Sequence, residues 1–199
     1  MLDPSVSNII DRPVPTFLSV ADARLQLNLF GDTSQDDYLQ MMCSVAQEQV
    51  EDYIGQYLQT TTTQNYYRYF DESGLRIAQP NLSCVTLKYW NENDELITID
   101  PSIYFIDTTI HPVMLKPRKN QNFPATNGLS ETRVNPVQIT YESILFGADS
   151  NMDIERVRQA MMLILTHWYN SRSNNDKDFK PEIEYGFLRL LNKYRLPTL

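Results

Sequence analysis

The sequence is poor in the residues that most often carry chemistry. It has two cysteines and two histidines in 199 residues, and its six glycines are scattered rather than gathered into a phosphate-binding loop. Neither Cys43 nor Cys84 has a second cysteine or a histidine pair nearby, so we expect two small buried thiols and no metal. The GxSxG, HExxH and DxDxDG patterns are absent as well. We therefore expect no cofactor and no enzymatic activity.

Long hydrophobic runs are also absent. No apolar stretch approaches the roughly 20 residues that span a bilayer, and the first residues lack the basic start and apolar stretch of a signal peptide. We therefore expect no membrane contact and a cytosolic origin. The hydrophobic fraction of 42% is nevertheless large enough to build a core.

Basic residues are scarce in the first third of the chain. Residues 1–57 carry nine acids and two bases, residues 58–148 nine acids and seven bases, and residues 149–199 seven acids and eight bases. Because phosphate binding depends on clustered Lys and Arg, the acidic start argues against a tightly held nucleic acid. An acidic wall would instead let DNA slide past. The basic final third keeps a nucleic-acid-binding module as an alternative.

Hydrophobic periodicity predicts helices at both ends and strands between them. Cap signals predict a first helix from Ser19 to Gly31, a second from Ser34 to Ile54, a third from Ser150 to about Arg172, and a fourth from Pro181. Threonine, tyrosine and alternating apolar residues predict short strands at 60–70, 82–90, 96–99, 103–106, 113–115 and 136–141.

These elements predict an α+β fold. We expect the N- and C-terminal helix pairs to form a four-helix bundle, with a small antiparallel β subdomain inserted between them. The expected segments are an extended N-terminal arm at 1–18, the bundle at 19–57 and 150–195, the β insertion at 58–149 with a long loop at 116–135, and a C-terminal tail at 196–199.

The second predicted helix carries both an apolar stripe and paired acids. The stripe, at helical spacing, comprises Tyr38, Met41, Met42, Val45, Ala46, Val50, Tyr53 and Ile54. Glu48 and Asp52 lie four residues apart on one face of the helix. They could act together on a small substrate, which leaves a hydrolase as an alternative, but a solvated helix face explains them more simply.

Several sequence pieces are typical of one known family. They are LSVADARLQL at 18–27, AQEQVEDYIG at 46–55, VTLKYW at 85–90, DIERVRQA at 153–160, HWYNSR at 167–172 and EYGFL at 184–188. In this order and spacing, over residues 18–195, the chain resembles the head-to-tail connector (adaptor or head-completion) proteins of tailed bacteriophages.

The resemblance implies a structural virion protein in the neck between capsid and tail, assembled in the cytoplasm of the bacterial host. It implies a homo-oligomeric ring of about twelve subunits around a channel through which DNA passes without specific binding. The implied partners are the portal protein and a tail, stopper or nozzle protein. A tail-completion or stopper-type neck protein is an alternative within the same class.

Three sets of residues are candidates for contacts within such a particle. The acidic first third suggests that Asp36, Asp37, Glu48 and Asp52 line the DNA channel. The net-positive final third and the resemblance suggest that Lys193, Tyr194, Arg195, Leu196 and Leu199 contact the portal. Arg118, Lys119 and Phe123, in the long loop, are candidates for facing the tail.

Overall fold

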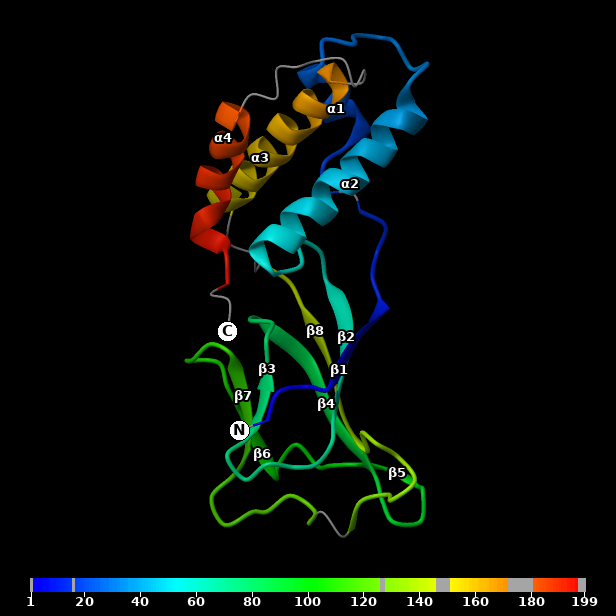
Figure 1. Ribbon diagram of the computed structural model, residues 1–199, viewed down its shortest axis with the longest axis vertical. Coiled ribbons are helices and arrows are strands. Elements are labelled where there is room, and N and C mark those ends of the chain that lie inside the picture. The colour runs from blue at the N-terminus through cyan, green and yellow to red at the C-terminus, as the bar shows by residue number, and fades with distance from the viewer. Residues whose placement is uncertain (1, 16, 126–127, 146–150, 172–180, 197–199) are drawn as a thin grey trace. The chain divides into compact units, whose positions relative to one another are not determined.

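The computed structural model describes residues 2–15, 17–125, 128–145, 151–171 and 181–196 (Figure 1). The chain forms two compact units. The β unit comprises residues 1–12 and 60–145, and the helical unit comprises residues 13–59 and 146–199. The α+β class is confirmed, whereas the arrangement of the helices as a four-helix bundle stays a prediction.

The helical unit begins with α1 (Val20–Gln26), whose start is fixed by the predicted capping box. The Ser19 hydroxyl accepts a hydrogen bond from the Asp22 backbone N–H at 3.1 Å, and the Asp22 carboxylate accepts one from the Ser19 backbone N–H at 3.4 Å. Helix α1 ends earlier than predicted, because Asn28 already takes a left-handed φ of 58° before Gly31 is reached.

Helix α2 (Asp36–Ile54) ends as predicted at Gly55, whose φ is 72° and whose N–H donates to the Glu51 carbonyl. It begins two residues later than predicted. The Ser34 backbone N–H bonds to the Asp32 carboxylate at 2.9 Å, so Ser34 closes a turn instead of capping the helix.

The C-terminal half of the helical unit contains α3 (Asn151–Asn170), α4 (Pro181–Leu191) and a 3₁₀ turn, η2 (Asn192–Tyr194). Helix α3 packs against α4 and α2, and α1 packs against α2 and α3. The buried apolar side chains of these helices include Leu39, Met42, Ala46, Val50, Val157, Ala160, Met161, Leu165 and Leu191. The predicted cap residue of α3, Ser150, lies outside the described residues.

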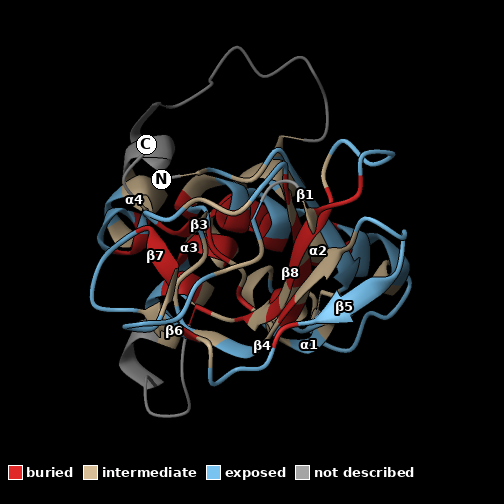
Figure 2. Cartoon of the chain, turned by 90° about the horizontal axis from the view of Figure 1, so that it is seen from below, coloured by how far each residue is buried: buried red, intermediate tan, exposed pale blue. Residues whose placement is uncertain are grey.

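The β unit consists of two antiparallel sheets that share one apolar core. The larger sheet has the order β1-β2-β8-β4-β5 and the smaller one β3-β7-β6. The strands are β1 (Val6–Asp11), β2 (Thr61–Tyr67), β3 (Leu75–Ile77), β4 (Leu82–Trp90), β5 (Leu96–Thr98), β6 (Tyr104–Asp107), β7 (Val113–Pro117) and β8 (Val137–Ser143). Figure 2 shows β8 largely buried in the middle of the larger sheet and β5 exposed at its edge.

Two strands were not predicted from the sequence. Strand β1 lies within the segment expected to be an extended arm, and it pairs antiparallel with β2 from Val6–Tyr66 to Asp11–Thr62. All six of its residues are exposed. The short strand β3 pairs with β7 and forms one edge of the smaller sheet.

The expectation of two buried thiols is wrong for one of them. Cys43 is buried in α2, but Cys84 is exposed. The register of β4 against β8 shifts between Ser83 and Thr86, and Cys84 takes a left-handed φ of 51° there. The irregular backbone interrupts the inward-outward alternation of the strand, and this leaves the thiol at the surface.

Candidate functional site

The outer face of α2 combines acids with large apolar side chains. Asp37, Glu48 and Asp52 are exposed, and Met41 (54% exposed) and Val45 (44%) lie between them. At 100° per residue, all five fall within one third of the helix circumference. We call this surface, together with Tyr38, the α2 face.

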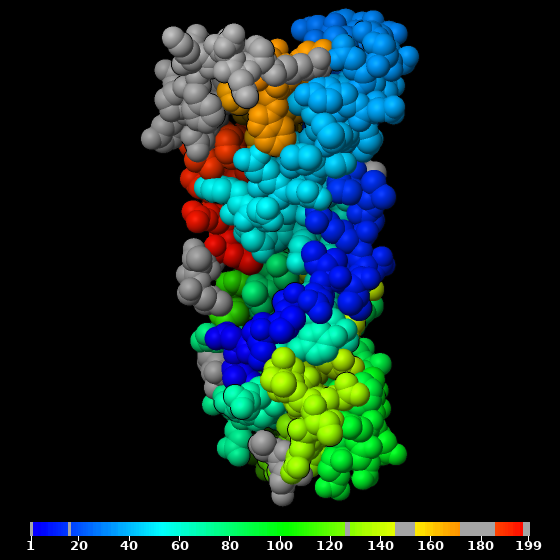
Figure 3. Space-filling view, turned by 45° about the vertical axis from the view of Figure 1, so that its right-hand side comes forward, coloured from blue at the N-terminus to red at the C-terminus, as the bar shows by residue number. Residues whose placement is uncertain are grey.

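Three residues of the apolar stripe, Tyr38, Met41 and Val45, lie outside the core. The core positions of α2 are Leu39, Met42, Cys43, Ala46, Val50 and Ile54. The apolar residues of α2 occupy a wider part of its circumference than the buried positions do, so those outside the buried stripe are exposed to solvent. Leu25 (64% exposed) and Phe30 (70%), in α1 and the segment after it, are also exposed. Figure 3 shows this side of the helical unit, where α2 and the preceding segment form the surface.

The α2 face is also uniform in charge. Between Arg24 and Arg68 the sequence has six acids and no Lys or Arg. Asp36 differs from the other predicted channel residues, because it is half-buried and its carboxylate lies 3.2 Å from Nε of Arg24. The structure therefore brings Asp37, Glu48 and Asp52 onto one exposed face and holds Asp36 in an ion pair.

A buried polar cluster in α2 was missed by the sequence analysis. The Gln47 amide donates to the Glu51 carboxylate and to the Gln59 side chain, each at 2.9 Å. The same Glu51 oxygen accepts the Leu58 backbone N–H at 2.9 Å, and the Gln47 side chain accepts the Phe17 backbone N–H at 3.1 Å. The cluster thus joins the segment before α1 and the segment after α2 to the second half of α2. Gln47 and Glu51 lie between the buried positions Cys43 and Ile54 at helical spacing, and this was the available signal.

The C-terminal segment folds back onto the end of α2. The Gln56 amide donates to the Tyr194 carbonyl at 2.5 Å, and the Leu196 N–H donates to the Ile54 carbonyl at 2.9 Å. The Arg195 guanidinium lies 5.2 Å from the centre of the Tyr53 ring. Among the predicted portal residues, Lys193 and Arg195 are exposed, Leu196 is half-buried and Tyr194 is buried. Leu199 lies outside the described residues.

The long loop between β7 and β8 is fastened to the β unit at several points. Nε of Arg118 donates to the Tyr104 carbonyl at 3.0 Å, and the Phe123 ring stacks on Phe70 at 4.8 Å. Lys119 is exposed. Of the three residues predicted to face the tail, Lys119 is exposed, whereas the side chains of Arg118 and Phe123 contact other residues of the β unit.

Asp94, in the turn after β4, fastens the second half of this loop. Its carboxylate accepts hydrogen bonds from the hydroxyls of Ser130 and Thr132. These bonds, the one from Ser130 above all, lower its pKa. Arg133 lies 3.5 Å from the same carboxylate and covers the Trp90 ring, with its guanidinium carbon 3.5 Å from the ring centre.

Among the described residues of the β unit, one open hollow is lined by residues that include Arg68 and Arg133 and another by residues that include His111. Neither of these hollows contains Glu48 or Asp52. Among the described residues, no group of three or more Asp, Glu, His or Cys side chains could hold a metal ion. No helix in that part of the chain is both long and apolar enough to cross a membrane.

Three solved chains have the same fold over nearly their full length. One belongs to the virion of the native gene transfer agent particle (TM-score 0.68, 16% identity, 97% of this chain and 96% of that one). A second belongs to the neck of the empty particle, computed with C6 symmetry (0.68, 16%, 98% and 97%). A third belongs to the neck of the native particle, computed with C12 symmetry (0.63, 18%, 98% and 97%).

Part of the sequence also matches a known family. The family of phage gp6-like head–tail connector proteins matches residues 17–89, a segment that contains α1, α2 and most of strands β2 to β4. The resemblance to head-to-tail connector proteins is therefore confirmed. Among curated proteins, none matches the sequence.

Proposed function

We propose that this chain is a head-to-tail adaptor that forms a ring between the portal and the tail of a tailed phage or a phage-like particle. The observation that carries the proposal is the connector-family match, on a chain whose whole fold is that of neck proteins. The C12 symmetry used for one of those necks supports a ring of about twelve subunits. In this role the protein resides in the virion neck, is assembled in the bacterial cytoplasm and performs no catalysis.

A ring in this position surrounds the DNA on its way to the tail. The acidic first third supports passage without tight binding, because it offers few cations to the phosphates. Asp36, Asp37, Glu48 and Asp52 are the residues that this acidic bias suggests for the lumen. A lumen role for the last three competes with a protein contact, because apolar side chains lie between them.

The C-terminal segment is the proposed portal contact. Lys193 and Arg195 are exposed there, while Tyr194 is buried and holds the segment to α2. Leu196 and Leu199 would supply apolar anchors beside the two cations. The loop with Arg118, Lys119 and Phe123 is proposed to meet a tail, stopper or nozzle protein, with exposed Lys119 as the contact and the other two as supports.

The adaptor proposal is tested with isolated portal rings from the same particle. Mass photometry and cryo-electron microscopy of portal mixed with this protein should show a second ring of about twelve copies attached to the portal. Failure to bind bare portals would refute the adaptor role. Binding only to portals that already carry another connector would establish the stopper alternative instead.

The portal contact is tested separately by charge reversal. The double variant Lys193→Glu/Arg195→Glu should weaken portal binding by at least about tenfold, because it places negative charge where cations are expected to set the register. Arg156→Glu, which reverses an exposed base on α3, is the matched control. Equal affinity of the double variant and the wild type would place the portal contact elsewhere.

A further inference from the structure

The α2 face has the composition of a protein interface rather than of a channel wall. Met41, Val45 and Tyr38 are 54%, 44% and 37% exposed, and they alternate around the helix with Asp37, Glu48 and Asp52. A wall past which DNA slides gains nothing from large apolar side chains in water. An interface gains from both components, since apolar groups supply affinity and charges supply register.

A surface with complementary charge exists on the same unit. Arg189 is an exposed base on α4, and Leu188 and Leu190 beside it are only half-buried. The side chains of Glu182 and Glu184, earlier in the helix, lie outside the described residues. We call the surface formed by Leu188, Arg189 and Leu190 the α4 face. It offers a cation and partly exposed leucines to a partner that brings acids and apolar side chains.

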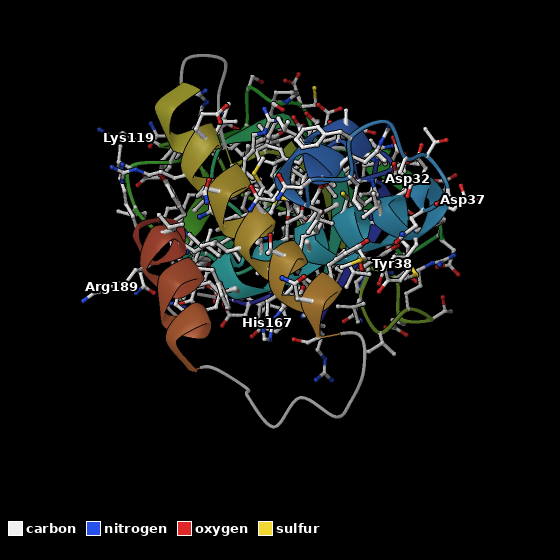
Figure 4. All side chains as sticks on the ribbon, turned by 90° about the horizontal axis from the view of Figure 1, so that it is seen from above. Asp32, Asp37, Tyr38, Lys119, His167 and Arg189 are labelled. Atoms are coloured by element: carbon white, nitrogen blue, oxygen red, sulfur yellow. The ribbon has the colours of Figure 1, made fainter. Side chains whose placement is uncertain are left out.

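The two faces lie on different sides of the helical unit. Helix α3 packs against both α2 and α4, and Figures 1 and 4 place α2 and α4 on either side of it. In Figure 4, Asp32, Asp37 and Tyr38 lie at one side and Arg189 at the opposite side. A head-to-tail ring needs two different, complementary surfaces on each copy that point in opposite directions.

From these observations we infer that the α2 face of one copy binds the α4 face of the next copy, and that this contact closes the ring. The inference rests on the proposed ring and names its lateral interface. It assigns Asp37, Glu48 and Asp52 to the joint between subunits, and it leaves the DNA channel to other parts of the chain.

The first test disrupts the apolar part of the α2 face. Met41→Glu/Val45→Glu changes two exposed side chains, so the isolated fold should persist, as circular dichroism and thermal unfolding would show. Wild-type copies should load onto portal rings cooperatively, so that rings are either empty or full. The variant should load non-cooperatively, leave rings partly filled, and need at least about tenfold more protein for half-occupancy. Glu92→Lys, in the β unit, is an exposed-charge control.

The second test exchanges the charges of the two faces. Asp37→Lys/Glu48→Lys/Asp52→Lys on its own, and Arg189→Glu on its own, should each abolish cooperative loading. The combined variant should recover part of it, because opposite charges again meet across each joint. Recovery of this kind requires that the two faces contact each other and is not explained by a lumen role.

The outcomes separate the interface from the proposed function. Wild-type rings on the portal, together with normal cooperative loading of the Met41→Glu/Val45→Glu and charge variants, would overturn the interface and keep the adaptor role. Normal ring assembly of the triple lysine variant with altered passage of DNA would assign the acids to the lumen and overturn the interface. Absence of any ring from the wild-type protein would instead overturn the proposed function.

Discussion

Removal of the Glu51 carboxylate should destabilise the helical unit more than any change to an exposed acid of the same helix. Glu51 is 5% exposed, and one of its oxygens accepts bonds from the Gln47 amide and the Leu58 N–H. In Glu51→Ala both donors lose this acceptor, and the Leu58 N–H lies in a residue that is 2% exposed. A buried donor without a partner costs about 1–3 kcal/mol, and a bond to a charged acceptor contributes about 1.5–3 kcal/mol. We therefore expect a loss of about 3 kcal/mol.

The two tryptophans allow this loss to be assigned to one unit. Trp90 lies in β4 and Trp168 in α3, so a Trp90→Phe background leaves a fluorescence probe in the helical unit alone. Urea unfolding in that background should give the free-energy change directly, and the melting temperature should fall by about 6–12 °C, at about 2–4 °C per kcal/mol for a chain of this size.

Two neighbouring variants provide the controls for Glu51→Ala. Glu51→Gln keeps an acceptor oxygen in place and should lose less. Glu48→Ala removes an exposed acid one turn earlier and should change stability by less than about 0.5 kcal/mol. If Glu51→Ala costs no more than Glu48→Ala, the cluster does not hold the segments around α2 and the reasoning is wrong.

Three further outcomes are expected. Asp94→Ala should leave the unfolding midpoint nearly unchanged but speed tryptic cleavage within loop 118–136, because the loop loses its hydrogen bonds to that carboxylate; unchanged cleavage would contradict this. The hydrogen bond from Ser19 lowers the pKa of Asp22 below 3.8, so the stability it contributes is present above pH 3.8 and is lost as the pH falls through the lowered pKa. In Asp22→Asn the urea midpoint should depend less on pH between pH 5 and 3 than it does in the wild type. An identical fall of the midpoint with acid in the variant and the wild type would refute this role of Asp22. Burial raises the pKa of the Cys43 thiol to about 11, so a thiol reagent should label exposed Cys84 in the native protein and Cys43 only on unfolding; equal rates would show that Cys43 is accessible.

Local signals in the sequence were sufficient for the helices that have clear caps. The Ser19–Asp22 box and Gly55 fix ends of α1 and α2 through bonds that span only a few residues. Strand β1 was missed because its pairing depends on β2, more than fifty residues later, and its own side chains show no buried face. Pairing at that distance leaves no local pattern to detect.

The candidate surfaces were predictable in charge but not in exposure. The absence of bases between Arg24 and Arg68 is visible in the sequence, and it led to Glu48 and Asp52. Which side chains of α2 are buried depends on tertiary packing, and the buried polar ones are Gln47 and Glu51 rather than Glu48 and Asp52. Met41 and Val45 are exposed, which the apolar stripe alone did not indicate.

The register of the larger sheet determines where the chain leaves and re-enters the β unit. Asp11 pairs with Thr62 at the end of β1, and Thr61 pairs with Ser143 at the end of β8. The three connections to the helical unit therefore leave from one end of one sheet. Residues 12 and 60 are close enough to be joined by a short hairpin turn. A chain of residues 1–12 joined by such a turn to residues 60–145 would then carry every strand of both sheets in one contiguous polypeptide.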